Sequence, residues 1–463
     1  MASKYQVVIL GAGPGGYLLA ERIGKRFKTA IIEKDAFGGT CLNVGCIPSK
    51  ALLYSRKVYR AVSHAADYGV KVGSFSYDHQ QAVRRKDEKV GLLVQGVEAK
   101  VKANKVDIFR GFGQVSGQSS EGFLIKVNGQ DLVAEKLVIA TGSVPNIPPI
   151  EGLDELIKNR DKILTNVEVL ALEKLPKQLV IIGGGVIGLE MAAYFQNLGP
   201  EIHVVEFLDQ VGGNLDQEIS QQILNYYQER GVKFYLGHQA VKVDQHHLSV
   251  KNRATGQVFQ IPYEKILLAT GRTPNSANMG FEKIGLYLEK GAVVTNEKCQ
   301  TNLANVYAIG DVNGVSMLAH TAYREAEVVM HQLLGQTWDT VDYNAIPNVI
   351  YTDPEIATVG PSEEELQKNG VDYQVYKMPM LYSGRFVTEV DDYAGLVKML
   401  VDPKTRRILA VHMVGQYATE IIAIAGLMVT KMMSVDLVRD LVIPHPTVAE
   451  LLKELIMQEV PHA

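Results

Sequence analysis

The chain is poor in cysteine, in net charge and in long apolar runs. Three cysteines in 463 residues exclude the disulfide framework of a small secreted protein. A net charge of −4 argues against nucleic acid or an anionic membrane surface as the main partner. The longest apolar stretch, Ile421 to Val429, lies between Glu420 and Lys431 and is too short to span a bilayer. We therefore expect neither nucleic acid nor a membrane among the partners.

The chain has the composition of an ordinary globular protein, with 46% hydrophobic and 21% charged residues. A length of 463 residues is too great for one hydrophobic core, so we expect about two to four domains. Met1 to Tyr5 leads straight into an apolar segment and shows no sign of a signal or transit peptide. On these grounds we expect a cytoplasmic protein.

A predicted nucleotide-binding turn stands near the start of the chain. Tyr5 to Leu10 is an apolar run typical of a buried parallel strand, and Tyr17 to Arg26 is predicted to be helical. A Gly-x-Gly-x-x-Gly turn lies between them, and a second strand over 29–32 ends in Glu33. Such glycines allow a tight turn, close approach of a pyrophosphate and close helix packing, while the acidic residue accepts a ribose hydroxyl. The glycines are Gly11, Gly13 and Gly16.

The same pattern recurs in the middle of the chain. A strand over 179–182 leads into a second glycine turn, a helix over 189–198 and a strand over 202–205 that ends in Glu206. Each copy is followed later by an Ala-Thr-Gly turn, at 140–142 and at 269–271. This internal duplication predicts two nucleotide-binding domains and two dinucleotides. The glycines of the second turn are Gly183, Gly185 and Gly188.

The two predicted sites differ in their surroundings. The first lies beside two cysteines, which favours a flavin, because a flavin passes two electrons between a dithiol and a nicotinamide. At the second site Glu206 favours a free ribose hydroxyl, and residues 207–210 include no basic side chain for a 2′-phosphate. The sequence thus predicts FAD in the first site and NAD, not NADP, in the second.

Cys41 and Cys46 stand five residues apart. In an ideal helix their Cα atoms would be about 8.7 Å apart, beyond the limit of roughly 7 Å for a disulfide. If they are bonded, the segment between them is not regular helix, and Gly45 and Pro48 are residue types that permit such a distortion. Spacing alone leaves two reduced thiols, a catalytic pair and a metal-binding pair open. No metal ligands are predicted elsewhere.

Residues 38–50, with the sequence GGTCLNVGCIPSK, resemble the redox motif of the pyridine nucleotide-disulfide oxidoreductase family, and most closely its dihydrolipoamide dehydrogenase group. The other motifs extend this resemblance over essentially the whole chain. It implies a redox-active Cys41–Cys46 disulfide facing FAD. It also implies that Lys50 pairs with Glu190 beside the flavin, where a cation stabilises negative charge on the reduced ring. Cys299 is expected to be a bystander.

The resemblance also implies further contacts to both cofactors. Asp311 is expected to bond the ribityl chain of FAD, and the segment 318–320 to lie along the same cofactor. Predicted FAD contacts are Lys34, Gly39, Thr40, Lys50, Gly113, Thr141, Gly142, Ser143, Asp311 and Ala319, and predicted NAD contacts are Val241 and Gly271.

Near the end of the chain, Pro444-His445-Pro446-Thr447-Val448-Ala449-Glu450 resembles the catalytic His-Glu motif of the family. A histidine can take a proton from a thiol near neutral pH, and Glu450 would hold its other nitrogen. The resemblance implies a homodimer in which His445 acts on the disulfide of the other subunit, and a cis peptide before Pro446. Ile443 departs from the family pattern, which usually has an earlier histidine there, and this puts the substrate channel in doubt.

The expected fold class is α/β: two Rossmann-like dinucleotide-binding domains, for FAD and NAD, plus an α+β C-terminal dimerisation domain. The expected boundaries are 1–146 for the first part of the FAD-binding domain, 147–272 for the NAD-binding domain, 273–344 for the second part of the FAD-binding domain, and 345–463 for the interface domain.

The resulting functional hypothesis is the reoxidation by NAD of protein-bound dihydrolipoyl groups, on a lipoylated protein of a 2-oxo acid dehydrogenase or glycine cleavage complex. An NADH-dependent reductase of another disulfide and a non-catalytic redox-sensing flavoprotein are the alternatives. A glutathione reductase-like enzyme would need a basic NADP pocket, and residues 207–210 include no basic side chain. A mercuric reductase would need a C-terminal cysteine pair, and 457–463 contains no cysteine.

Overall fold

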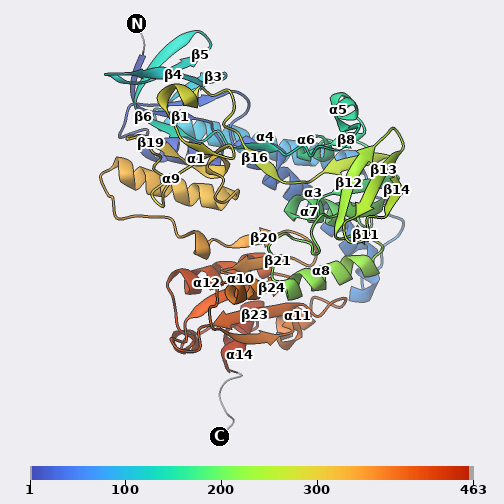
Figure 1. Ribbon diagram of the computed structural model, residues 1–463. Helices are drawn as coiled ribbons and strands as arrows, with labels where there is room; N and C mark the ends of the chain where they lie inside the picture. Colours follow the sequence, from blue (N-terminus) through green and yellow to red (C-terminus); the bar gives the residue numbers. More distant parts are fainter. Residues whose placement is uncertain (1–2, 458–463) are drawn as a thin grey trace.

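The computed structural model, described here for residues 3–457, contains two nucleotide-binding sheets and a C-terminal antiparallel sheet, so the predicted α/β fold class is correct (Figure 1). The first sheet has the strand order β3-β2-β1-β6-β5-β4, with β19 also paired to β6. Its central strands β1, β2 and β6 run parallel, as a nucleotide-binding unit requires. Their bounds are β1 Ser3–Leu10, β2 Thr29–Glu33, β3 Asp107–Arg110, β4 Gln114–Ser119, β5 Gly122–Val127, β6 Gln130–Ile139 and β19 Val306–Ala308.

Two helices pack together beside this sheet. Helix α1, Pro14–Ile23, follows the first glycine turn, and α9, Ala319–Leu333, follows Asp311 much later in the chain. Leu19 and Ile23 of α1 share a buried core with Val328 and Val329 of α9. The return of the chain from β19 into α9 therefore completes the first nucleotide-binding unit.

The second sheet is wholly parallel, in the order β11-β10-β9-β15-β8. Its helix α7, Val186–Phe195, is buried along most of its length, which suits its mostly apolar sequence. A separate antiparallel sheet, β12-β13-β14, lies beside it. The bounds are β8 Ile163–Leu164, β9 Gln178–Ile182, β10 Glu201–Val205, β11 Lys233–Tyr235, β12 His238–Val243, β13 His247–Asn252, β14 Val258–Pro262, β15 Lys265–Leu268 and α8 Gln217–Glu229.

The two halves of the duplication meet in a reciprocal contact. Strand β7, Ser143–Pro145, pairs antiparallel with β16, Arg272–Pro274, directly after the two Ala-Thr-Gly turns. Thr141 Oγ1 donates to the Asn275 carbonyl over 2.7 Å, and its counterpart Thr270 Oγ1 donates to the Asn146 carbonyl over 2.9 Å. The repeated motif thus forms a symmetric contact between the two halves of the duplication.

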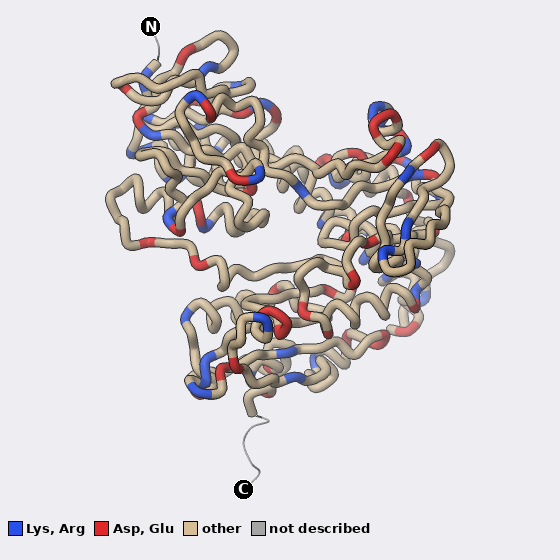
Figure 2. The backbone as a smooth tube through the Cα atoms, in the orientation of Figure 1, with Lys and Arg blue, Asp and Glu red and all other residues tan. Residues whose placement is uncertain are grey.

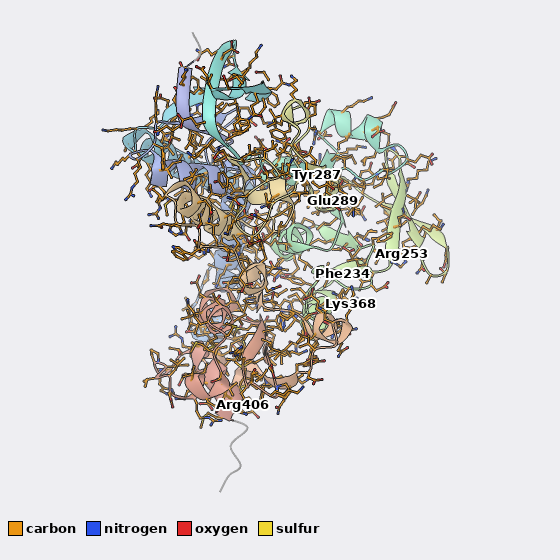
Figure 3. All side chains as sticks on the ribbon, turned by 60° about the vertical axis from the view of Figure 1, so that its left-hand side comes forward. Phe234, Arg253, Tyr287, Glu289, Lys368 and Arg406 are labelled. Atoms are coloured by element: carbon orange, nitrogen blue, oxygen red, sulfur yellow. A yellow bond between two sulfur atoms is a disulfide. The ribbon has the colours of Figure 1, made fainter. Side chains whose placement is uncertain are left out.

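The C-terminal sheet is antiparallel, in the order β20-β21-β24-β23-β22, and packs against α12 and α14. Side chains from β23, β24, α12 and α14 share one buried core. In the turned view of Figure 3, Arg406 marks this part of the molecule at the end away from the first sheet. The bounds are β20 Asn348–Ile350, β21 Ile356–Val359, β22 Gln374–Met378, β23 Leu396–Val401, β24 Ile408–Val414, α12 Ala418–Thr430, α13 Val435–Arg439 and α14 Leu451–Met457.

Two helices lie between the nucleotide-binding parts: α3, Cys46–Ser63, and α4, His79–Ala103. Their sequences suggest solvated basic faces, and at two positions this is wrong. Arg56 is 2% exposed, and Lys86 is 5% exposed with its ammonium beside Asp87 Oδ1 at 2.5 Å. Burial is tolerated because each charge has a carboxylate partner. The remaining short elements are α2 Gly39–Val44, α5 Leu153–Leu156, α6 Asn166–Leu170, β17 Leu288–Glu289, β18 Ala292–Val293, α10 Glu363–Lys368 and α11 Gly384–Val387.

Charged residues of both signs are interspersed over the whole backbone in Figure 2. Over residues 3–457, no helix combines the length and the apolar character needed to cross a membrane. Residues 458–463 lie outside the described part of the chain. That this segment has no cysteine, which bears on the mercuric reductase alternative, is known from the sequence.

Candidate active site

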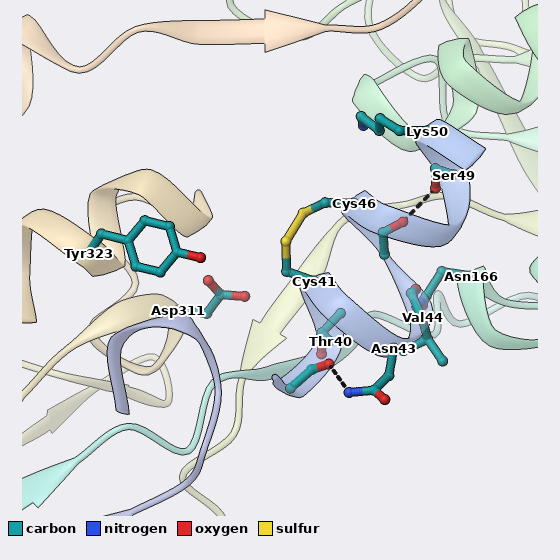
Figure 4. Close-up of a disulfide and its surroundings, with 12 residues drawn as sticks. Thr40, Cys41, Asn43, Val44, Cys46, Ser49, Lys50, Asn166, Asp311 and Tyr323 are labelled. Atoms are coloured by element: carbon teal, nitrogen blue, oxygen red, sulfur yellow. Dashed lines mark hydrogen bonds between the residues drawn. A yellow bond between two sulfur atoms is a disulfide. The ribbon is translucent and has the colours of Figure 1, made fainter. Parts of the chain in front are cut away.

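Cys41 and Cys46 form a disulfide that links the short helix α2 to the start of the longer helix α3 (Figure 4). Their Cα atoms are 4.6 Å apart, and the helix is interrupted as expected: α2 ends at Val44 and α3 begins at Cys46. Between them Gly45 has φ −146° and ψ −112°. A side chain there would place its Cβ 2.9 Å from the Thr40 carbonyl oxygen, so only glycine allows this approach.

Side-chain amides hold the redox segment in place. Asn43 Nδ2 donates to the carbonyls of Phe37 and Gly39, each over 2.9 Å, and Asn166 Nδ2 donates to the Val44 carbonyl over 2.7 Å. Asp311 and Tyr323 face the disulfide from the opposite side in Figure 4. The disulfide segment therefore lies between Asn166 on one side and Asp311 and Tyr323 on the other (Figure 4).

The first glycine turn has the shape of a dinucleotide cradle. A Cβ on Gly16 would lie 2.0 Å from the Gly11 carbonyl oxygen, so this glycine is needed for the packing of α1. A Cβ on Gly13, by contrast, would meet no protein atom within 4 Å, although Gly13 begins a buried helix. Open space at a helix N-terminus with free N–H groups fits a pyrophosphate. Glu33 Oε2 accepts the Ala12 N–H over 2.7 Å at the rim of this space.

The second turn repeats this arrangement. A Cβ on Gly188 would lie 2.0 Å from the Gly183 oxygen, whereas one on Gly185 would meet nothing within 4 Å. Glu206 is buried, and its Oε2 accepts the Gly184 N–H over 2.5 Å. The residues present therefore fit a second dinucleotide.

Other predicted contacts cluster around the meeting point of the two halves. Ser143 Oγ donates to Asp311 Oδ2 and accepts from Arg272 Nε over 2.6 Å. Arg272 Nη2 also donates to Thr40 Oγ1 over 3.2 Å, which ties the second Ala-Thr-Gly turn to the redox segment. Gly142 and Gly271 hold positive φ angles of 70° and 90° with open space beside them.

The remaining predicted contacts are more scattered. Lys34 is half exposed and lies 3.7 Å from Asp35 Oδ2, and Gly113 packs under the tips of buried side chains of β1 and β2. Ala319 begins α9, and Gly39 approaches Gly13, with its would-be Cβ 2.7 Å from the Gly13 Cα. Val241 is the residue skipped at the β12–β13 bulge, and its carbonyl accepts the Glu151 N–H over 3.1 Å.

Lys50 and Glu190 form an ion pair across 140 residues. Lys50 Nζ lies 2.7 Å from Glu190 Oε1 and 2.8 Å from Oε2. The Glu190 side chain is 5% exposed and the Lys50 side chain 31%. A buried carboxylate thus holds a partly open ammonium one helical turn after Cys46.

His445 and Glu450 also form a pair. His445 Nδ1 lies 2.8 Å from Glu450 Oε1, and the Thr447 N–H donates to Glu450 Oε2 over 2.8 Å. The Thr447 N–H and the His445 ring hold the pKa of Glu450 below its ordinary value. The His445–Pro446 peptide is cis, and the His445 side chain is 80% exposed.

The pair is not next to the disulfide of its own chain. Helix α14, which follows Glu450 directly, lies at the end of the molecule away from α3 and the first sheet (Figure 1).

The third cysteine, Cys299, is fully buried, and burial raises the pKa of its thiol. Among residues 3–457 no three His, Cys, Asp or Glu side chains gather as a metal site would require.

Sequence reasoning missed Arg272, although a signal for it exists. The two repeats read Ala-Thr-Gly-Ser-Val-Pro-Asn and Ala-Thr-Gly-Arg-Thr-Pro-Asn, so Arg272 is the counterpart of Ser143. An arginine at the position where the other repeat has a serine points to a contact that only one of the two turns makes. Tyr351 was also missed, because nothing in its local sequence indicates that it reaches the Lys50–Glu190 pair.

Two dinucleotide cradles and a disulfide in the segment that packs against the first of them indicate a flavin-dependent disulfide oxidoreductase. The chain belongs to the pyridine nucleotide-disulphide oxidoreductase family, whose main domain matches residues 5–326 and whose dimerisation domain matches residues 346–456. The dihydrolipoyl dehydrogenases to which the chain is similar use FAD and NAD, the two cofactors predicted above, and the dimerisation domain supports a homodimer.

Relatives of known activity cover almost the whole chain. Mitochondrial dihydrolipoyl dehydrogenase of Pisum sativum is 38% identical over 98% of this chain and 91% of its own. Dihydrolipoyl dehydrogenase of Bacillus subtilis is 36% identical over 98% of both chains. Among solved structures, the HOCl-induced flavoprotein disulfide reductase RclA from Escherichia coli superposes with a TM-score of 0.85 at 26% identity, covering 98% of this chain and all of that one.

Proposed function

We propose that this protein oxidises protein-bound dihydrolipoyl groups with NAD, as a dihydrolipoyl dehydrogenase. The observation that carries the proposal is the Cys41–Cys46 disulfide at the start of α3, in the segment whose Gly39 packs against Gly13 of the first glycine turn. Relatives with that name at 36–38% identity support it. The cytoplasmic location and the lipoylated partner remain predictions.

Cysteine chemistry accounts for the first half of the reaction. His445 takes the proton of one dihydrolipoyl thiol, and the thiolate attacks the Cys41 sulfur. A mixed disulfide forms as the Cys41–Cys46 bond breaks, and Cys46 leaves as a thiolate. The second lipoyl thiol then attacks the lipoyl sulfur of the mixed disulfide and gives its proton to the departing Cys41 sulfur, so that the oxidised lipoyl ring closes and Cys41 leaves as a thiol, while the first proton is held by His445. Two electrons and two protons have passed from substrate to protein.

The protein's charged groups support these steps. Glu450 holds the ring of His445 and stabilises its protonated form, as a carboxylate does in a catalytic triad. Lys50, held by Glu190, supplies a cation one turn from Cys46. When bound, FAD and NAD supply the two-electron outlet that returns the dithiol to the disulfide.

The domain plan proposed for this function has residues 1–146 and 273–344 holding FAD, 147–272 holding NAD, and 345–463 forming the interface. In that plan His445 and Glu450 serve the disulfide of the partner subunit. The 80% exposure of His445 in the single chain supports this arrangement, because a proton-transfer group needs a partner surface to exclude water from it.

A second candidate is an NADH-dependent reductase of another disulfide. The structural similarity to a flavoprotein disulfide reductase at 26% identity supports it, and so does Ile443 at the position where the family usually has a histidine. A redox sensor without turnover is a third. The presence of both cysteines and the His445–Glu450 pair argues against that possibility.

Substrate and cofactor choice test these candidates in one assay. The flavin-loaded protein is given lipoamide with NADH, lipoamide with NADPH, and oxidised glutathione with each. We expect turnover with lipoamide and NADH alone. Turnover with another disulfide but not lipoamide supports the reductase, and no turnover with any disulfide contradicts an enzymatic function.

A further inference from the structure

The Lys50–Glu190 pair has a third member. The Tyr351 backbone N–H donates to Glu190 Oε1 over 3.1 Å, the oxygen that also lies 2.7 Å from Lys50 Nζ. Glu190 is 4% exposed, so few solvent contacts compete for this carboxylate. Its orientation is therefore set by one ammonium and one backbone donor from a different part of the chain.

The side chain of Tyr351 acts on the other partner. Lys50 Nζ lies 4.4 Å from the centroid of the Tyr351 ring, well within the roughly 6 Å range of a cation–π contact. The Lys50 stem has four rotatable carbons and the side chain is 31% exposed, so the carboxylate alone leaves it room to turn. The ring closes one side of that space.

Tyr351 is itself fixed to the helix that carries Lys50. Two residues later, the Asp353 carboxylate lies 2.5 Å from Arg56 and 2.8 Å from Arg60, both on α3. The Asp353 N–H donates to the Tyr227 hydroxyl over 3.1 Å, and that hydroxyl donates to the Asp353 carbonyl over 3.0 Å. Because the segment is anchored at Asp353, the Tyr351 ring keeps its place relative to Lys50.

We propose that Tyr351 is a positioning residue that fixes the Lys50 ammonium and thereby tunes the electron affinity of the bound flavin. The inference rests on the proposed function, which places Lys50 beside the flavin. It adds that a residue from the region matching the dimerisation domain, outside both dinucleotide cradles, helps to set the chemistry of the redox centre. With the ring removed, the cation moves away part of the time and stabilises the reduced flavin less.

The test measures the midpoint potential of the bound flavin by equilibration with a dye, in the flavin-loaded dimer. In Tyr351→Leu, and in Tyr351→Met as a larger replacement, we expect the equilibrium to shift about tenfold toward oxidised flavin, which is about 30 mV for a two-electron couple. Tyr351→Phe keeps the ring and should restore the parent potential.

Two further variants complete the test. Tyr373 is half-buried in the same region and its hydroxyl accepts from Gln367, so Tyr373→Leu is a matched loss of an aromatic ring and should keep the parent potential. Lys50→Met should lower the potential at least as far as Tyr351→Leu. If Lys50→Met lowers it and Tyr351→Leu and Tyr351→Met do not, the role of Tyr351 is wrong. If Lys50→Met has no effect, the proposed role of Lys50 fails, and the inference fails with it.

Discussion

At the residue scale, the account depends on where the sulfur atoms lie. Cys41 and Cys46 are only partly exposed, bonded to each other, and held by a glycine that no other residue could replace without a clash. Cys299 is a thiol of a different kind, fully buried and remote from the disulfide in sequence. Cys46 is therefore a suitable position for testing the role of the disulfide, and Cys299 is the control for the loss of a cysteine elsewhere.

Replacing Cys46 by Ser should abolish turnover of any disulfide substrate, because the exchange has no second sulfur to release. The flavin should remain bound, since the cradle proposed for it is the first glycine turn. Absorbance of bound flavin and NADH-dependent lipoamide reduction measure the two effects, with Cys299→Ala as the control that keeps activity. Loss of flavin from Cys46→Ser would show a structural role instead.

A second residue-scale prediction concerns Glu325. Burial raises its pKa to about 7, although the Gly310 N–H, Asn313 amide and Tyr343 hydroxyl act in the opposite direction. An unfolded glutamate titrates near 4.3, so the folded state binds more protons between these values. The free energy of unfolding should therefore fall by about 3 kcal/mol as pH rises from about 4 to 7 and change little above that through this group.

Thermal unfolding at a series of pH values measures this effect. Glu325→Gln cannot titrate and should lose that part of the pH dependence. Glu327→Gln removes a half-exposed carboxylate on the same helix and should retain it. Parallel pH profiles for the parent and Glu325→Gln would show that Glu325 is not the titrating group.

At the scale of elements, sequence periodicity identified most of the nucleotide-binding strands to within a residue or two. The strand predicted over 179–182 is β9, Gln178–Ile182, and that over 202–205 is β10, Glu201–Val205. Helix α3 begins at Cys46, because the helix resumes directly after the break at Gly45. Contacts such as Thr141 to Asn275 could not be predicted, since they depend on how the two repeats pack.

The two kinds of glycine within one turn should respond differently to the same substitution. Gly188→Ala places a methyl group 2.0 Å from a backbone oxygen and should destabilise the second nucleotide-binding half. Gly185 has φ −77°, which alanine adopts readily, and open space beside it. Gly185→Ala should therefore keep the parent thermal stability but raise KM for NADH, because its methyl group occupies the place of the phosphates.

Thermal unfolding and steady-state kinetics with NADH separate these effects. The control must be a glycine whose backbone alanine can adopt, which excludes glycines with positive φ such as Gly199. Gly96→Ala, in the exposed part of α4 with nothing within 4 Å, is the matched control: it should leave KM for NADH unchanged and raise the thermal stability slightly, because alanine is favoured over glycine inside a helix by about 1 kcal/mol. An unchanged KM in Gly185→Ala would place the nucleotide elsewhere.

At the scale of the whole molecule, the C-terminal part presents apolar side chains to solvent in the single chain. Leu427 is 56% exposed, Met432 61% and Val442 95%. All three lie in the region that matches the dimerisation domain, where a partner subunit would cover apolar side chains. This fits the homodimer and the proposal that His445 completes the site of the partner.

Mixed dimers test that arrangement. Cys46→Ser and His445→Gln should each be nearly inactive alone. If subunits pair at random after mixing and dissociation, half of the dimers are mixed and each has one intact site, so activity should return to about a quarter of the parent value. Mixtures that remain inactive, although mixed dimers are shown to form, would place His445 at the disulfide of its own chain.

The central claim is that electrons from the nicotinamide reach the sulfur atoms of Cys41 and Cys46. Anaerobic treatment with NADH, followed by denaturation and counting of free thiols, tests it directly. With one free cysteine and one disulfide in the chain, the count should rise from one to three per subunit. A flavin that is reduced by NADH while the count stays at one would contradict the account.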